Sequence, residues 1–221
     1  MKRITVLIYI LFSTIVFGQI DKQQLALDIS ATDALNTKKL MPFVWKRTST
    51  ATVDGEIKGT VINEIRFDSV GKIKATVIGG ESSSKDKRGI RGKIQDSKKK
   101  STMDYVEKAL KLSISYIYMS KGEYLDFFEK AVITEKENVI EASGSNIYIQ
   151  GDSLTVLIDA KTKLFISKKF SSTLEEDPIN GDVKYELFSS GINHGSETIL
   201  NLPGKKAIIS AKNSDYTQLI K

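Results

Sequence analysis

Apolar residues recur at every third or fourth position across residues 21–41, which is the spacing of one face of an amphipathic helix. Pro42 ends this predicted helix because proline cannot continue the helical hydrogen bonds. Residues 43–78 are instead rich in Thr, Val, Ile and aromatic side chains, and turn sequences at Asp54-Gly55 and at residues 68–71 interrupt them. Because Asp-Gly between β-prone runs favours a tight hairpin, we expect antiparallel strands near residues 43–53, 56–67 and 72–78.

A polar stretch covers residues 79–101, and a second helical pattern follows it. Its apolar residues are spaced by three or four positions and are predicted to share one face; they are Met103, Val106, Leu110, Ile114 and Ile117. Ser120, with Glu123 three residues later, has the pattern of a capping box and predicts the start of a third, shorter helix. The aromatic residues after it would give that helix a broad apolar surface.

From Ala131 onward the chain returns to short β-prone runs such as "NIYIQ" (residues 146–150) and "SLTVLID" (residues 153–159). Turn-forming residues separate these runs at 136–138, 151–152, 159–163, 180–181, 191–195 and 203–204. The pattern predicts six or seven further strands in a meandering antiparallel sheet. The predicted fold class is therefore α+β: a single curved antiparallel sheet of about nine or ten strands, an open half-barrel, with about three helices packed in its concave face.

The first 18 residues have the pattern of a secretory signal peptide. Lys2 and Arg3 precede a mostly apolar run, and the small residue Gly18 marks the expected cleavage site. The apolar run is shorter than the roughly 20 residues that span a bilayer, although an uncleaved membrane anchor is the alternative. We expect an exported, periplasmic or secreted protein in which residues 19–221 form a single domain that acts as a monomer.

Composition argues against several classes of function. The chain has no Cys, so it has neither a disulfide nor a cysteine for lipid modification, and its one histidine, His194, stands in the turn-like sequence "GINHG". Zinc and copper sites usually need Cys or His ligands, and we find no nucleophile or phosphate-loop motif. We therefore expect a protein that is not an enzyme, that needs no cofactor and in which His194 is a solvated turn residue. Loss of Lys2 and Arg3 on cleavage lowers the formal charge from +6 to +4, and we expect no nucleic-acid partner.

One segment is strongly basic: "KDKRGIRGKIQDSKKK", residues 85–100. Its glycines and scattered acids favour a solvated loop between the third strand and the second helix. The alternative is a contact with anionic lipid head groups or with an acidic envelope protein, since each basic residue near a charged membrane contributes about 1 kcal/mol. The residues that would make this contact are Lys87, Arg88, Arg91, Lys93, Lys98, Lys99 and Lys100.

Trp45, the only tryptophan, stands in the first predicted strand. It is either a core anchor near the start of the sheet or a residue at the rim of a lipid cavity. Alternation places Arg47 on the same face as Trp45. An arginine buried there would need a carboxylate or carbonyl partner.

Five segments stand out as a set, although most of them mark hairpins. They are "TVDGEIKGT" (52–60), "EIRFDSVGKI" (64–73), "KRGIRGKI" (87–94), "GDSLTVLIDAKTK" (151–163) and "NSDY" (213–216). Through them the chain resembles an uncharacterised family of exported bacterial proteins. The order of signal peptide, helix, three strands, helical insertion and long meander also resembles the LolA-like superfamily. That superfamily includes periplasmic lipoprotein carriers, mycobacterial lipid-binding lipoproteins and the sensor domain of sigma-factor regulators.

The resemblance implies a non-catalytic protein that binds a lipid, acyl chain or lipoprotein in an apolar half-barrel cavity under a helical lid. The expected lining takes one apolar face from each strand and from the lid: Trp45, Arg47, Ile62, Met103, Leu110, Ile117, Phe128, Ile149, Val156 and Phe170. For each of these residues, packing in an ordinary core is the alternative. The alternative function is an envelope interaction or sensor module with a filled core, which would bind a partner protein or an anionic surface through residues 85–100.

Overall fold

The computed structural model describes residues 20–68, 72–82, 90–188 and 191–219, with the backbone alone for residues 82 and 90–103. Three α-helices, ten strands and one short 3-10 helix follow one another in this part of the chain. In order they are α1 (Lys22–Leu40), β1 (Phe43–Val53), β2 (Glu56–Phe67), β3 (Ile73–Ser82), α2 (Ile90–Ile117), α3 (Lys121–Lys130), β4 (Val132–Lys136), β5 (Val139–Ser145), β6 (Ser153–Asp159), β7 (Phe165–Leu174), β8 (Asp177–Leu187), β9 (Asn193–Leu202), η1 (Pro203–Lys205) and β10 (Ala207–Gln218).

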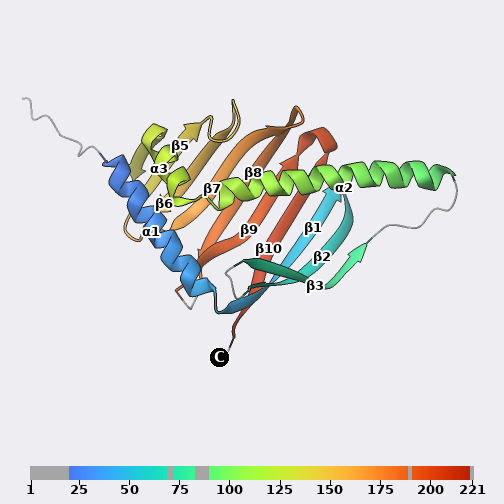
Figure 1. Ribbon diagram of the computed structural model, residues 1–221, viewed down its shortest axis with the longest axis horizontal. Coiled ribbons are helices and arrows are strands. Elements are labelled where there is room, and N and C mark those ends of the chain that lie inside the picture. Colours follow the sequence, from blue (N-terminus) through green and yellow to red (C-terminus); the bar gives the residue numbers. More distant parts are fainter. Residues whose placement is uncertain (1–19, 69–71, 83–89, 189–190, 220–221) are drawn as a thin grey trace, which may run out of the picture.

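All ten strands belong to one antiparallel sheet with the order β3-β2-β1-β10-β9-β8-β7-β6-β5-β4. Strands β4 to β10 form a meander, and β10 then pairs with β1 in the middle of the sheet. The helices α2 and α3 connect β3 at one edge with β4 at the other, and the sheet is open and curved (Figure 1). The predicted fold class, an α+β half-barrel with helices on its concave face, is confirmed.

Side-chain hydrogen bonds cap the starts of α1 and α3. The side chain of Asp21 accepts a hydrogen bond of 3.0 Å from the backbone N–H of Gln24 at the start of α1. Ser120 and Glu123 form the predicted capping box at the start of α3. Helix α3 contacts α1 and β5, whereas α2 contacts β7 and β8. Within the described residues, no helix is long and apolar enough to cross a membrane.

The connection between β3 and α2 differs from the predicted one. Strand β3 continues to Ser82, and α2 already begins at Ile90. Residues 79–101 are therefore not one long loop, and the basic residues from Arg91 to Lys100 lie on the first turns of a helix. Lys87 and Arg88 lie outside the described residues.

The turn predicted at residues 180–181 is wrong. Asn180 and Gly181 lie inside β8, and the turn before that strand is formed by Glu175 and Glu176, which both have positive φ angles. Gly181 is a glycine because a Cβ there would lie 2.1 Å from the ring of Phe170. A glycine that permits close packing has the same appearance in the sequence as a glycine in a turn.

Residues 146–150 were predicted as a strand but form a compact loop. The carboxylate of Asp152 accepts hydrogen bonds from the backbone N–H groups of Ile147, Tyr148 and Ile149, at 2.5, 2.8 and 3.0 Å. These three donors are therefore not available to a neighbouring strand, so Ile149 lies in a loop.

Helix α2 also turns a different face toward the core than its apolar spacing predicts. Tyr116 is buried, whereas Leu110 and Ile114 are exposed. The ring of Tyr116 stacks on Phe170 with 4.5 Å between centroids, and its hydroxyl donates a 2.6 Å hydrogen bond to Asp152. These partners determine the rotation of the helix and leave its aliphatic stripe outside the core.

Candidate functional site

The concave face of the sheet divides into two regions that differ in their packing. We call β4 to β9 the covered half, because α2 and α3 lie against its strands. We call β10, β1, β2 and β3 the open half; Figure 1 shows that α2 crosses only the ends of β10 and β1 and that no helix lies in front of the rest of β10, β1 and β2. The division decides which of the predicted lining residues are able to reach a ligand.

The covered half is filled by protein side chains. Its core joins all three helices to the sheet and contains three of the predicted lining residues, Phe128, Val156 and Phe170. Each of these side chains is at most 4% exposed. The structure therefore places them in a packed core.

A buried lysine connects the helices in the covered half. Lys168 of β7 donates hydrogen bonds to the Ile117 carbonyl at the end of α2, at 2.6 Å, and to the Tyr124 hydroxyl, at 3.1 Å. Its ammonium also lies 4.1 Å from the centre of the Phe165 ring. Burial lowers the pKa of Lys168 to about 8, although the nearby Asp33 of α1 opposes this shift.

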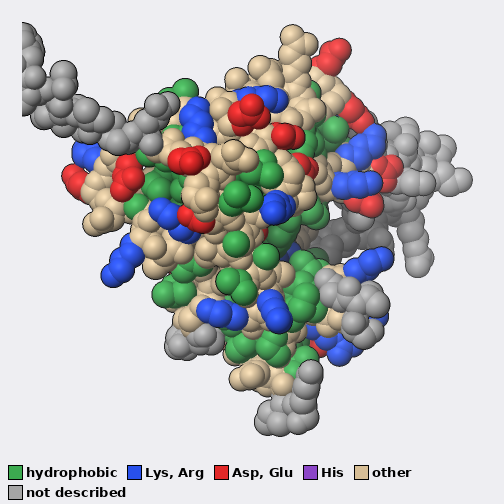
Figure 2. Space-filling model, turned by 60° about the vertical axis from the view of Figure 1, so that its left-hand side comes forward, with side chains coloured by type: hydrophobic (Ala, Val, Ile, Leu, Met, Phe, Trp, Pro, Cys, Tyr) green, Lys and Arg blue, Asp and Glu red, His purple; other side chains and the backbone are tan. Residues whose placement is uncertain are grey.

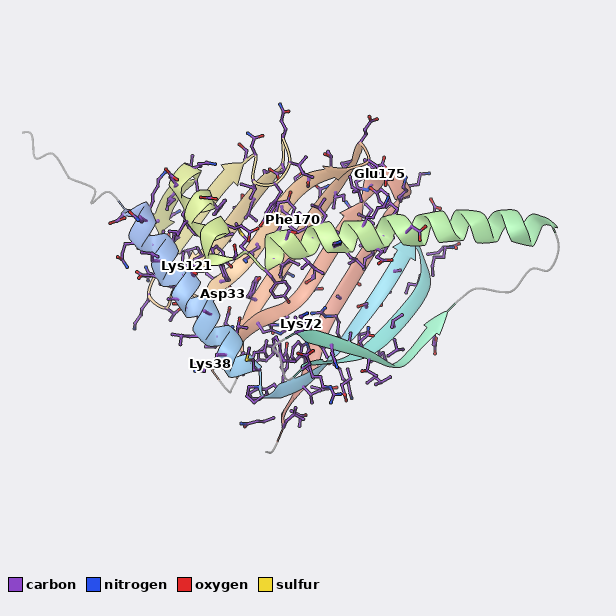
Figure 3. The ribbon with its side chains drawn as sticks, viewed as in Figure 1. Asp33, Lys38, Lys72, Lys121, Phe170 and Glu175 are labelled. Atoms are coloured by element: carbon purple, nitrogen blue, oxygen red, sulfur yellow. The ribbon has the colours of Figure 1, made fainter. Side chains whose placement is uncertain are left out.

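Asp33 lies on the side of α1 that is turned toward the end of α2 (Figure 3). Burial raises the pKa of its carboxyl, and the charge of Lys168 and a 3.2 Å hydrogen bond from the Tyr124 hydroxyl limit the rise. One lysine thus links α1, α2, α3 and the sheet, and this arrangement holds the helices on the covered half.

The open half exposes apolar side chains on its concave side. Trp45 and Ile65 are paired across β1 and β2 in a small buried cluster beneath the end of α1, which identifies this side of the strands as concave. By alternation and strand pairing, Val61, Ile73 and Val77 face the same side, and all three are exposed. Figure 2 shows hydrophobic side chains gathered in the lower half of the molecule, with Lys and Arg side chains among them.

Two aliphatic residues of α2 also lie outside the core. Leu110 and Ile114 are spaced by four residues and both are exposed, as is Tyr118 directly after the helix. Tyr118 lies near Tyr216 of β10. Burial is the main cause of the raised pKa of the Tyr216 hydroxyl, and Tyr118 also raises it. The predicted lining residue Leu110 is therefore exposed and not packed in the core, and Ile117, at the end of the helix, is half-buried.

Arg47 lies at the centre of the open half. It stands directly opposite Asn63 of β2 and Asn213 of β10, so that three polar side chains form a row across three strands. Its Nε donates a 2.9 Å hydrogen bond to the side-chain oxygen of Asn213. No carboxylate in the described ranges lies within ion-pair distance of its guanidinium. The partner that the sequence predicted is thus an amide oxygen.

An aromatic cluster closes one end of the open half. The Trp45 ring stacks on Tyr216 and meets His194 edge-on, with 5.9 and 5.1 Å between centroids. His194 is buried in β9, and its Nδ1 is 2.5 Å from the Tyr216 hydroxyl. The prediction of a solvated turn histidine is therefore wrong. Burial, together with the charge of Arg47, lowers the pKa of His194 to about 4, so this ring is neutral at pH 7.

The remaining predicted residues fall elsewhere. Ile62 alternates with Val61 and faces the convex side of β2, and Ile149 lies in the loop before β6. Met103 and the basic residues Arg91, Lys93, Lys98, Lys99 and Lys100 lie on α2 among residues whose side chains are not described. Sequence reasoning missed Asn63, Asn213 and Tyr118. The two asparagines emerge only from the strand register that places them beside Arg47.

The cavities among the described residues include two that lie away from the open half. One, of about 620 Å³, lies between the start of α1 and α3 and is bounded by residues that include Asp21, Leu125 and Glu129. The other, of about 350 Å³, lies mainly against the convex side of β6 to β9, where Lys169 and Asp182 border it.

Comparison with known proteins gave the following results. No family model matches the sequence, and no curated protein matches it. Two solved structures are similar to the chain at 10% identity. One is a DUF1329 family protein from Desulfovibrio piger, which covers 89% of this chain and 91% of its own length with a TM-score of 0.43. The other is a LolA superfamily protein from Nitrosomonas europaea, with 89% and 94% coverage and a TM-score of 0.36.

One of these two neighbours is a LolA superfamily protein, and the sequence resembles that superfamily. Neither neighbour assigns a role to any residue of this chain. What the site is able to do follows from its own side chains: an exposed apolar surface with one half-buried cation at its centre.

Proposed function

We propose that the protein is an exported, non-catalytic binding protein that holds a lipid, an acyl chain or a lipoprotein on the open half of its concave face. The observation that supports this most directly is the exposure of Val61, Ile73 and Val77 on the concave side of the open half, together with the exposure of Leu110 and Ile114 on α2. Exposed apolar patches on a concave face are a feature of hydrophobic binding sites. Each square ångström covered by a ligand contributes about 25 cal/mol to binding.

In this proposal the two halves have different roles. The covered half, with Lys168 joining its helices, is the scaffold. The open half is the binding surface, and α2 forms the lid beside it. Movement of α2 about its anchored end at Ile117 would change the width of the site without disturbing the packed core.

The first experiment is native mass spectrometry with organic extraction on protein purified from its own cell envelope. A stoichiometric lipid or acylated peptide is expected. Recovery of the protein at its bare mass, together with failure to bind any acyl compound added later, would contradict the proposal.

A pair of variants then locates the binding surface. Val61→Asp places a charge on the concave side of the open half, whereas Ile208→Asp places one on the convex side. The two residues are equally suitable because they are 42% and 44% exposed. Only Val61→Asp is expected to release the lipid, since burying an unpaired carboxylate against an acyl chain is unfavourable. Equal loss from both variants would show that the ligand does not lie on the concave side.

The second candidate is an envelope interaction module that uses the basic segment. It is favoured by the early start of α2: the helix carries Arg91, Lys93, Lys98, Lys99 and Lys100 on a part that extends past the edge of the sheet (Figure 1). Charge reversal at Lys98, Lys99 and Lys100 would abolish binding to an anionic surface under this candidate. It would leave the lipid content measured by mass spectrometry unchanged.

A further inference from the structure

Arg47 has more hydrogen-bonding capacity than the protein uses. A guanidinium carries five N–H donors, and only its Nε has an acceptor in the described part of the chain, the side-chain oxygen of Asn213. The side chain is half-buried, so water satisfies the other donors only in part. A charged group held in such a position without a carboxylate is costly unless a further partner binds it.

A second hydrogen-bond donor beside Arg47 also lacks a partner. The indole Nε1 of Trp45, two residues before Arg47 on the same face of β1, is buried and has no acceptor among the described residues. Neutral His194 adds no positive charge, and its Nδ1 is engaged by the Tyr216 hydroxyl. Glu186 is a nearby acidic residue. Burial is the main cause of the raised pKa of Tyr216, and the charge of Glu186 adds to it. Glu186 forms no ion pair with Arg47. The centre of the open half is therefore suited to an anion.

The same cation is surrounded by apolar side chains. Val77 lies beyond Asn63 in the row across the strands, and Ala211 follows along β10 on the concave side. Val61 and Ile73 add exposed apolar surface on the same side. A small inorganic anion would leave this apolar surface exposed, whereas an amphiphile would cover it and meet the cation at once.

We propose that Arg47 binds the single anionic head group, a carboxylate or a phosphate, of an amphiphile whose acyl chain lies along the open half. This inference rests on the function proposed above and names the class of ligand for the same surface. Arginine suits this role because its planar guanidinium binds the two oxygens of a carboxylate or phosphate at once.

The test compares ligands that share a chain and differ in the head group. Isothermal titration of the full chain, as recovered after export and delipidated, uses dodecanoate, dodecyl phosphate, dodecanol and inorganic phosphate alone. Trp45, the only tryptophan, provides a second readout through its fluorescence. We expect the two anionic amphiphiles to bind about ten- to a hundredfold more tightly than dodecanol, because hydrogen bonds to charged groups are stronger than those to neutral ones.

The variant Arg47→Gln is expected to bind dodecanoate no more tightly than dodecanol, while its affinity for dodecanol stays that of the unchanged protein. Arg66→Gln is the matched control, because Arg66 lies on the convex side of β2 and is exposed. It should leave all four affinities unchanged. Arg47→Lys keeps the charge without the planar fork and is expected to give an intermediate loss, which guards against a variant that merely fails to fold.

Each other outcome has a distinct meaning. Equal affinity for dodecanol and dodecanoate, with no effect of Arg47→Gln, would overturn the assignment of Arg47 and leave the proposed lipid-binding function standing. Binding of none of the three dodecyl compounds would overturn both. Arg47-dependent binding of inorganic phosphate, with no gain from a dodecyl chain, would show a site for a free anion and would also overturn the proposal.

Discussion

The covered and open halves of the sheet are built from the same kind of strand, but the concave side is buried in the covered half and exposed in the open half. In the covered half the helices bury Val156 of β6 completely, whereas in the open half Val77 of β3 remains 68% exposed on the concave side of its strand. The difference is not one of hydrophobicity, since both regions present apolar residues to the concave face. It arises because Lys168 and its partners hold the helices over β5 to β8, and no comparable contact of the described residues holds α2 against β1 to β3.

The largest expected effect is a difference in the free energy of unfolding between a variant in the covered half and a variant in the open half. Phe128→Ala should lower the free energy of unfolding by about 3–5 kcal/mol, because it removes a large buried side chain and leaves a cavity. Val77→Ala should change it by less than about 0.5 kcal/mol, as for other exposed positions. Urea denaturation of both variants measures this. Similar losses would mean that the open half is packed in solution as tightly as the covered half.

The next effect concerns the lysine that holds the helices. Its pKa is about 8 in the folded protein and 10.5 is the ordinary value, so between these pH values the unfolded chain binds more protons than the folded one. The contribution of Lys168 to stability should therefore rise as the pH increases from 8 to about 10.5, by up to about 3 kcal/mol.

Lys168→Met should lack this rise, because the variant has no group there to titrate. Lys169→Met is the matched control: Lys169 is the next residue, is exposed and pairs with Asp182 on the other side of the sheet. Denaturation curves at pH 8 and 10 test the difference. If Lys168→Met still shows the rise in stability, other titrating groups cause it and the assignment to Lys168 is wrong.

A smaller effect should distinguish tight from loose packing at two glycines. Gly181→Ala would place a Cβ 2.1 Å from the Phe170 ring of the covered half, which must then move at a cost of about 1–3 kcal/mol. Gly195→Ala meets its nearest side chain, Val183, at 3.4 Å, which is an ordinary contact. The two midpoints of thermal unfolding should therefore differ, with Gly195→Ala closer to the unchanged protein. Identical midpoints would show that the core under α2 is able to yield.

Much of the fold could be predicted because its signals are local. The limits of α1, β1 and β2 follow from Pro42 and from the Asp54-Gly55 turn, both of which act on the backbone within a few residues. The buried face of α2 could not be predicted, because it depends on partners of Tyr116 that lie in β7 and in the loop before β6. Spacing along a helix reveals that a stripe exists but does not say whether protein or ligand covers it.

The candidate site was predictable to a lesser degree. Alternation alone placed Arg47 beside Trp45, and the structure bears out that these two share the concave side. Asn213, which accepts the Arg47 hydrogen bond, lies 166 residues further along the chain. Only the register of β1 with β10 brings the two together. His194 was misjudged for the same reason, since its burial depends on aromatic residues of β1 and β10.

The position of β10 has a consequence for how the molecule assembles. The hairpins of β1 to β3 come first in the chain, yet among the described strands they are joined to the rest of the sheet by β10 alone, which follows all the others. A chain made only as far as β9 therefore has two separate sheets, each with an unpaired edge where β10 belongs. Joining them closes a loop of more than a hundred residues, which is an entropically slow step. In this interval the edge strands are vulnerable to pairing with other chains, so β10 decides both when the sheet becomes continuous and how long it is exposed to aggregation.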